Sequence, residues 1–378
     1  MDKQTQVTLI DELLELHDSR TPYLDGDWER PALNRYLSTD VFARERERIF
    51  TRRPHIVAHV SELPGPGDFR TLKSGGRPLL LTRDESGHVR AFYNVCRHRG
   101  AKLVREEQGC QHRFSCPYHA WTWNNIGELI AVPHEKTGFP GLNRGEFGLK
   151  QIACQEYAGW IWVKLDSESD IDVASHLGDL GPEVLAMDAG DHVIASTTVR
   201  DTAANWKILV EGGIESYHFR VAHKNTIAPL FLDNLSTYQF FGSHIRSVLP
   251  RATIAELQTQ GDDAKDLGKH ANVLYTLFPG SQFLMQEDHF VWIQGTPISP
   301  DRTVLRISTM IPRKADTEDL RSYWLKHHEF TNITLEEDFV LGEDIQSGMS
   351  SGANEHLNFG RFEGALARFN ALVEDALN

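Results

Sequence analysis

The sequence contains few cysteines and no long hydrophobic run. Only four cysteines occur in 378 residues: Cys96, Cys110, Cys116 and Cys154. A small secreted protein held together by disulfides would carry more, so we expect a reduced, cytoplasmic protein. No stretch approaches the roughly eighteen apolar residues of a membrane span, and the first residues lack the basic and apolar segments of a secretion signal.

Basic residues are also in short supply. The chain has 39 Lys and Arg against 53 Asp and Glu, which gives a net charge of −14, and the two signs are interspersed. Proteins that bind nucleic acid present basic surfaces to the phosphates, so this balance argues against a nucleic-acid partner. The length allows two domains with separate cores.

Hydrophobic patterning divides the chain into three segments. Residues 1–50 read as helical, with Asp40 as the expected cap of a helix over 41–50. Residues 51–166 are short β-type runs separated by Pro/Gly turns, and residues 167–378 mix helical and extended runs. The sequence therefore predicts an α+β protein. The elements expected in the last segment are helices over 167–187, 203–219, 315–347 and 359–377 and extended runs over 236–249, 272–286, 289–296 and 302–310.

Two cysteine–histidine pairs are the most informative feature that is present. Cys96-Arg97-His98 and Cys116-Pro117-Tyr118-His119 each offer one thiolate and one imidazole. Such a set holds a [2Fe–2S] cluster with both sulfurs on one iron and both imidazoles on the other. A structural zinc site is the alternative, although zinc fingers usually group like ligands together.

A second metal site is indicated by His218 and His223, with Glu215 nearby. Oxygen-activating non-haem iron uses two imidazoles and one carboxylate, with open positions for O2. Two residues five apart lie roughly 140° apart on a helix, so we expect the helix to end or distort near residues 219–222. Glu215 is placed to hydrogen-bond the second nitrogen of His218. The alternative is an amphipathic helix with Glu and His on its solvated face.

The motifs Asn94–Ala101 and Cys116–Trp121 resemble the Rieske domain of the ring-hydroxylating oxygenase α-subunit family, and the likeness extends over about residues 36–370. The resemblance implies a β-rich Rieske domain over 51–166. It also implies a catalytic domain over 167–378 with a central antiparallel sheet of the helix-grip, START-like type. Residues 1–50 would then be a helical arm packed on the catalytic domain.

The resemblance also assigns roles. Cys96 and Cys116 would bind one cluster iron, and His98 and His119 the other. His218 and His223 look like the histidines of a mononuclear Fe(II) site. A carboxylate from a late helix completes that site in the family. We take Asp338 as this ligand and Glu337 as the alternative, in a stretch that also carries Glu343 and Gln346. Simple solvation of an acidic helix face is the other explanation for this stretch.

Two departures from the family pattern stand out. Gly212-Gly213 replaces a common Asn-aromatic pair, which suggests close packing or a kink. Glu215 replaces the usual aspartate that bridges an iron histidine to a cluster histidine, here the partner subunit's His119. A glutamate bridge resembles the carnitine oxygenase branch. The bridge implies a head-to-tail ring, with a homotrimer as the expected assembly.

The function that the resemblance implies is that of a terminal oxygenase component. A separate NAD(P)H-dependent flavin or iron–sulfur reductase, with or without a ferredoxin, would supply electrons to the [2Fe–2S] cluster and the mononuclear Fe(II). The expected substrate is a small aromatic, or a quaternary ammonium or amine, and aromatic compound catabolism is one expected setting. Monooxygenation with dealkylation and arene cis-dihydroxylation both remain open. A Rieske electron-transfer protein without a working mononuclear iron is the alternative from another class.

Overall fold

Residues from both ends of the chain build one unit, and the segment between them builds another. In the computed structural model, which describes residues 1–166 and 170–378, Met1–Ile49 and Leu177–Asn378 form the α+β unit, and Phe50–His176 form the β unit. The sequence placed the boundaries after residues 50 and 166. Residues 167–169, at the start of the expected helix over 167–187, lie outside the described residues.

The β unit consists of two antiparallel sheets. The larger has the strand order β1-β10-β9-β4-β3-β2-β5, and the smaller has the order β6-β7-β8. A core of large aromatics, among them Phe114, Trp121 and Trp123, encloses Cys96 and Cys116. The elements are β1 His55–His59, β2 Asp68–Ser74, β3 Arg77–Arg83, β4 Val89–Tyr93, β5 Gln108–Cys110, β6 Arg113–Ser115, β7 Thr122–Asn124, β8 Leu129–Ala131, β9 Gln151–Tyr157 and β10 Trp160–Lys164, with α4 Glu135–Gly138 and α5 Val173–Leu177.

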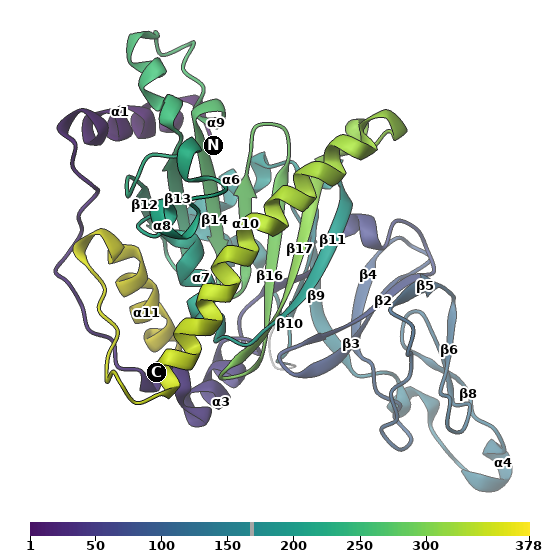
Figure 1. Ribbon diagram of the computed structural model, residues 1–378. Coiled ribbons are helices and arrows are strands. Elements are labelled where there is room, and N and C mark those ends of the chain that lie inside the picture. Colours follow the sequence, from purple (N-terminus) through teal and green to yellow (C-terminus); the bar gives the residue numbers. More distant parts are fainter. Residues whose placement is uncertain (167–169) are drawn as a thin grey trace. The chain divides into compact units, whose positions relative to one another are not determined.

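The α+β unit is built on one antiparallel sheet with the order β11-β17-β16-β15-β14-β13-β12 (Figure 1). Its strands are β11 His192–Thr202, β12 Thr237–Phe241, β13 His244–Pro250, β14 Ala271–Leu277, β15 Ser281–Met285, β16 Phe290–Ser299 and β17 Arg302–Pro312. The runs expected over 236–249 and 272–286 are each two strands joined by a tight turn, the first of them at Gly242 with φ +58°. The predicted α+β class with a central antiparallel sheet is confirmed.

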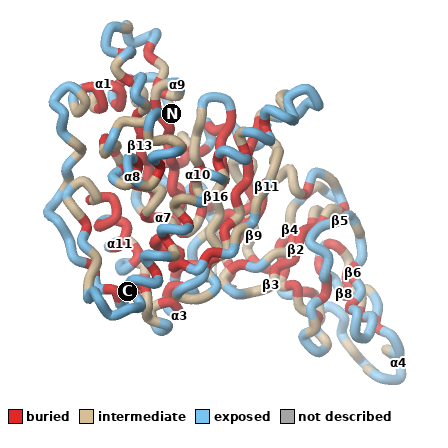
Figure 2. Tube along the Cα trace, viewed as in Figure 1, coloured by how far each residue is buried: buried red, intermediate tan, exposed pale blue. Residues whose placement is uncertain are grey.

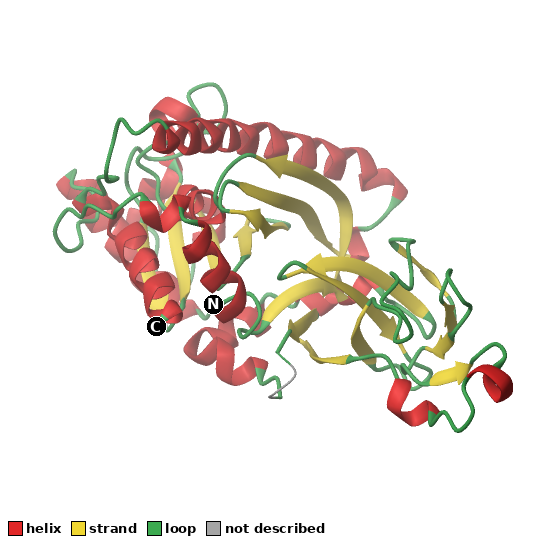
Figure 3. Cartoon of the chain, turned by 90° about the horizontal axis from the view of Figure 1, so that it is seen from below, coloured by secondary structure: helices red, strands yellow, loops and turns green. Residues whose placement is uncertain are grey.

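Helices cover this sheet, and α10 crosses it from end to end (Figures 1 and 3). The helices of the unit are α1 Lys3–Ser19, α2 Asn34–Leu37, α3 Thr39–Arg48, α6 Gly181–Ala186, α7 Trp206–Ile214, α8 Phe219–Ala222, α9 Leu267–His270, α10 Glu318–Ser350 and α11 Gly364–Leu377. Buried residues concentrate in the strands and in α7 (Figure 2). None of the helices in the described ranges combines the length and the apolar character that crossing a bilayer requires.

The N-terminal helices are anchored to α7 by a buried polar network. The Glu45 carboxylate accepts hydrogen bonds from the ammonium of Lys207 and from Trp206 Nε1, and Tyr36 donates to Glu211 at 2.7 Å. Glu45 and Lys207 are both buried, so loss of either would leave the other charge without its partner. The cap of α3 is Ser38, which accepts from Val41 N, rather than Asp40, because the helix begins one residue before Asp40.

Candidate metal centres

In the β unit, the two cysteine–histidine pairs lie on two loops with the same backbone geometry. In each loop the amide of the cysteine, Cys96 or Cys116, donates to the carbonyl five residues later at 2.8 Å. Four residues after each cysteine the backbone takes a positive φ, at Gly100 (76°) and Ala120 (55°). The first loop follows β4 and the second joins β6 to β7. Two matched turns therefore present two matched pairs of side chains.

The side chains of these loops meet. The rings of His98 and His119 are 4.8 Å apart, and His98 stacks on Trp121 at 5.0 Å with an interplanar angle of 7°. Cys96 and Cys116 are both buried, and burial raises the pKa of the Cys96 thiol. His98 Nδ1 is buried with no hydrogen-bond partner among the described residues.

An unpartnered buried imidazole nitrogen is rare, because it loses its hydrogen bond to water. Burial, His119 and Arg99 all lower the pKa of His98, which favours the neutral imidazole that binds metal. Two thiols and two imidazoles at one end of the unit therefore fit a [2Fe–2S] cluster with split ligation.

In the α+β unit, the chain breaks out of α7 just before the second pair of histidines. Helix α7 ends at Ile214, and Glu215 is extended (φ −129°, ψ 169°). A single turn of helix, α8, then separates His218 at its start from His223 at its end. The sequence expectation of a helix through residue 219 with a break at 219–222 was wrong. The break comes earlier, at Glu215. The carboxylate of Glu215 accepts a hydrogen bond from the backbone N–H of Tyr217, which stabilises the extended conformation.

Asp338 on α10 completes a three-residue cluster with these histidines. Its Oδ1 lies 2.9 Å from His223 Nε2 and 3.3 Å from His218 Nε2, and the three possible ligand atoms all lie within 4.8 Å of one another. His218 Nε2 is nevertheless buried without a well-aligned hydrogen bond among the described residues. The two nitrogens and the carboxylate oxygen thus point toward a common position, which is the donor set that non-haem Fe(II) uses.

A second carboxylate lies behind each histidine. Glu215 contacts His218 Nδ1, and Glu337 accepts at 2.8 Å from His223 Nδ1 and at 2.6 Å from Thr226. Metal-binding histidines commonly have their outer nitrogen held in this way, which fixes the ring and its tautomer. The structure therefore separates the two neighbours that the sequence left as alternatives: Asp338 faces the cluster, and Glu337 supports His223 from outside.

The charges in this centre are arranged for a cation. Burial lowers the pKa of His218, but Asp338 and Glu215 outweigh it and raise the pKa to about 10. Burial raises the pKa of Asp338, but the two histidines outweigh that effect and lower it. The carboxylates therefore favour positive charge at this centre, and a divalent cation bound there would take the place of protons on the histidines.

Helix α10 is held in register with the start of α7 by its own polar residues. Glu343 accepts from Ala203 N at 3.0 Å, and Gln346 accepts from Asn205 N at 2.9 Å. Gly342 faces α7, and a Cβ there would make an ordinary van der Waals contact with Leu209 at 3.4 Å. The sequence analysis singled out Glu343 and Gln346 next to Asp338. These two residues thus position α10 and are not part of the set formed by His218, His223 and Asp338.

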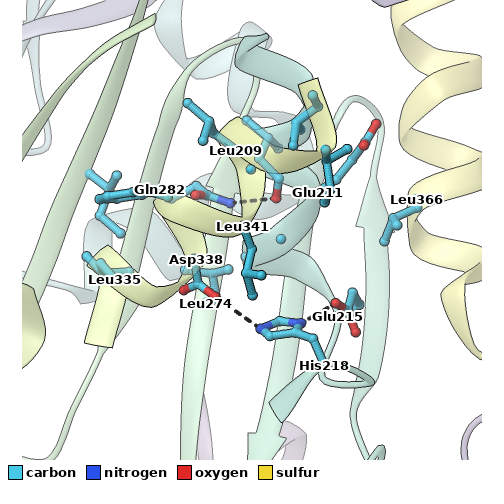
Figure 4. A pocket seen from close by; sticks show the side chains of 18 of the residues that line it. Leu209, Glu211, Glu215, His218, Leu274, Gln282, Leu335, Asp338, Leu341 and Leu366 are labelled. Atoms are coloured by element: carbon cyan, nitrogen blue, oxygen red, sulfur yellow. Dashed lines mark hydrogen bonds and ion pairs between the residues drawn. The ribbon is translucent and has the colours of Figure 1, made fainter. Parts of the chain in front are cut away.

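The three residues His218, His223 and Asp338 lie at a cavity of about 410 Å³ between α7, α10 and the sheet. Leucines form much of its wall near His218 and Asp338, as Figure 4 shows for Leu209, Leu274 and Leu335. Gln282 from β15 also lines it. No sequence pattern pointed to this residue, because a buried glutamine in a strand has no local pattern that distinguishes it from sheet core.

Comparison with known proteins gives two family matches. Residues 190–378 match the ring hydroxylating alpha subunit (catalytic domain) family, and residues 53–154 match the Rieske [2Fe-2S] domain.

Individual relatives fall into two groups. The chain is 33% identical over 363 residues to the glycine betaine monooxygenase oxygenase subunit of Pseudomonas aeruginosa, covering 84% of this chain and 82% of that one. It is 32% identical over 206 residues to the anthranilate 1,2-dioxygenase large subunit of Acinetobacter baylyi, covering 53% of this chain and 44% of that one. The match thus spans less than half of the second relative.

The fold is shared with solved structures. A crystal structure of a quaternary ammonium Rieske monooxygenase in complex with L-carnitine superposes with a TM-score of 0.79 at 24% identity, covering 93% of this chain and 96% of that one. At this identity the likeness establishes the fold and no more.

Proposed function

The chain belongs to the Rieske ring-hydroxylating oxygenase α-subunit family, and on that premise we propose that it is the terminal oxygenase component that oxygenates a small, mainly apolar organic substrate. The observation that carries the proposal is that His218, His223 and Asp338 converge at the wall of a mainly apolar cavity. When bound, the [2Fe–2S] cluster supplies single electrons, and the mononuclear non-haem iron supplies O2 activation.

The residues of the chain prepare this site. We assign the cluster to Cys96, His98, Cys116 and His119, and the mononuclear iron to His218, His223 and Asp338. Glu215 holds the Nδ1 proton of His218, and Glu337 does the same for His223. With their outer nitrogens fixed, both rings keep Nε2 directed at the metal position. The leucine walls exclude water and hold an apolar substrate beside the open positions of the metal.

We further propose that a second copy of the chain completes the catalytic machinery. A groove between α8 and α10 lies next to His218 and is lined by Val221, Ile333 and Val340, which are 71%, 58% and 46% exposed. In the β unit, Tyr118 and His119 are exposed at the tip of their loop. These features support head-to-tail packing in a closed ring, with Glu215 between His218 and the partner subunit's His119.

A homotrimer would have a mass of about three times the 42.8 kDa chain in sedimentation. Val340→Arg should lower that mass while leaving the iron content of each chain unchanged. A monomeric wild type that turns over at full rate would contradict the ring. The electron donor in this proposal is a separate NAD(P)H-dependent reductase, and the location is the cytoplasm.

The domain limits form part of the same proposal: a helical arm over 1–50, a Rieske domain over 51–166 and a catalytic domain over 167–378. Monooxygenation is favoured over arene cis-dihydroxylation because several relatives that match 84–93% of the chain are named monooxygenase oxygenase subunits.

Iron counting with EPR of the dithionite-reduced protein tests the proposal. We expect a reduced Rieske signal and about three irons per chain in the wild type. His223→Ala should keep the signal and retain about two irons. Two irons in both proteins would contradict the oxygenase and leave an electron carrier, whereas a colourless protein would indicate zinc.

A further inference from the structure

The side chains that line the cavity limit the charge that a bound substrate can carry. Resting on the proposed function, we propose that this oxygenase takes an uncharged, mainly apolar substrate that bears no carboxylate, and that Gln282 Oε1 orients it by accepting a hydrogen bond from a hydroxyl or N–H group.

No lysine or arginine is available in the cavity for a substrate carboxylate. None of the residues lining the cavity is a lysine or an arginine, and all of them belong to the described part of the chain. Arg220 is on the surface, 3.4 Å from Asp233. Lys207, on α7 itself, is buried and bound to Glu45. A carboxylate that entered the cavity would lose its hydration without gaining an ion pair to a lysine or arginine, which weakens its binding.

The acidic groups already present make an anion still less favourable. Glu211 and Glu363 line the cavity together with Glu215 and Asp338. Burial raises the pKa of Glu211 to about 7 and also raises that of Glu363, which shows how poorly this wall solvates negative charge.

The cavity is not built for a quaternary ammonium either. Such a group is recognised by aromatic faces arranged around it. The part of the wall drawn in Figure 4 is mainly aliphatic, with Leu209, Leu274, Leu335, Leu341 and Leu366. Five aromatic residues also line the cavity: Trp206, Phe219, Phe231, Phe339 and Phe359. Phe219 and Phe231 pack edge to face on each other at 5.6 Å and 83°, Trp206 packs edge to face on Phe369 at 5.8 Å, and the Arg200 guanidinium lies over the Phe339 ring at 5.4 Å, so these rings are engaged by protein groups.

Gln282 provides a polar contact within this apolar wall. Its Nε2 donates to Val210 O at 3.3 Å and to Thr276 Oγ1 at 3.1 Å, which uses both hydrogens. Oε1 accepts no hydrogen bond from the described residues. Gly213 makes room for the amide, because a Cβ at that position would lie 2.8 Å from Nε2. The glycine that departs from the family pattern therefore allows a fixed acceptor to face the substrate.

Calorimetric titration of the anaerobic, iron-loaded protein with matched probes tests this inference. The probes are 4-tert-butylbenzyl alcohol, 4-tert-butylbenzoate and 4-tert-butylbenzyl-trimethylammonium, which share one apolar body and differ in charge. We expect the alcohol to bind at least about tenfold more tightly than either ion, since an unpaired buried charge is far costlier than a hydroxyl that finds an acceptor. Equal or tighter binding of either ion, or no binding of any of the three, would overturn the proposal.

The role of Gln282 needs a second comparison. In the wild type the alcohol should bind more tightly than 4-tert-butyltoluene, and Gln282→Leu should bring the two within about twofold of each other, because the acceptor is gone. Thr276→Val, which removes a partner of Nε2 but keeps Oε1, should preserve the preference for the alcohol. If Gln282→Leu does not fold, Gln282→Met replaces it. A preference that survives loss of the amide would contradict the role of Gln282.

The iron content of the same preparations separates the possible failures. About three irons per chain with tight binding of the benzoate would overturn only the inference on substrate charge. About two irons per chain would overturn the oxygenase itself, whatever the probes do.

Discussion

The histidines of the two metal centres lie in opposite electrostatic environments. In the β unit, His98 is surrounded by a second imidazole, an arginine and an indole, and its pKa is lowered by burial, by His119 and by Arg99. In the α+β unit, Glu215, Glu337 and Asp338 surround His218 and His223 and raise their pKa values against burial. A cluster of thiolates and sulfides brings its own negative charge, whereas a lone Fe(II) needs the protein to supply it.

The centres also differ in how far apart their ligands lie in the sequence. All four cluster residues come from two short loops of one unit, so their spacing alone indicates a metal site, and the flanking residues, which resemble a Rieske motif, favour the cluster over zinc. The mononuclear site needs a carboxylate from α10, more than a hundred residues beyond the histidines, and only the packing of α10 on α7 brings it there.

The largest effects should come from removing one centre at a time. Cys116→Ser should abolish the reduced Rieske EPR signal and retain the mononuclear iron. Asp338→Ala should lose that iron and keep the signal. Each variant should lower substrate oxidation to background, because the function needs both metals. Iron analysis and EPR on the same samples check this, and loss of both metals in either variant would break the separation of the two centres.

Removing the carboxylate behind His223 should have a graded effect. Glu337→Gln replaces the charged acceptor of His223 Nδ1, and we expect iron affinity to fall by about 10–100-fold, the usual effect of losing such a support. Glu336→Gln is the matched control, since this neighbour on α10 pairs with Arg200 instead. Competition with a fluorescent chelator measures both affinities. Equal affinities would show that His223 does not depend on its carboxylate.

The buried acid beneath the cavity should make the α+β unit sensitive to pH. Burial raises the pKa of Glu211 in the folded state from 4.5 to about 7. The favourable contribution of Glu211 to the free energy of unfolding is therefore complete below pH 4.5 and is lost as the pH rises through 7. Glu211→Gln should keep the bonds from Tyr36 and Asn370 and stabilise the protein at pH 8 by up to about 3 kcal/mol. Thermal unfolding at pH 5 and pH 8 tests this; a difference independent of pH would contradict it.

The two glycines of α7 should respond in opposite directions. Gly213→Ala places a methyl group 2.8 Å from Gln282 Nε2, and we expect a net loss of about 1 kcal/mol after the gain in helix propensity. Gly212→Ala meets no heavy atom within 4 Å and should stabilise α7 by up to about 1 kcal/mol. Urea unfolding distinguishes the two, and equal effects would show that Gln282 moves aside freely.

Local patterns in the sequence were sufficient for the fold class and the family, and they singled out the two histidines that the structure brings together. They failed where distant contacts decide the outcome. Strand β11 was not predicted, because its residues His192–Thr202 are half-buried and carry no clear apolar alternation. Adjacent residues on a helix point about 100° apart, so only the orientation of α10 could show that Asp338 faces the histidines while Glu337 lies behind His223.

A crystal structure of the iron-loaded protein would test the central claim most directly. We predict that one Asp338 oxygen and both Nε2 atoms bind the mononuclear iron directly, with Glu215 and Glu337 still on the outer nitrogens of the two histidines. An iron bound through Glu337, with Asp338 turned away, would contradict this account.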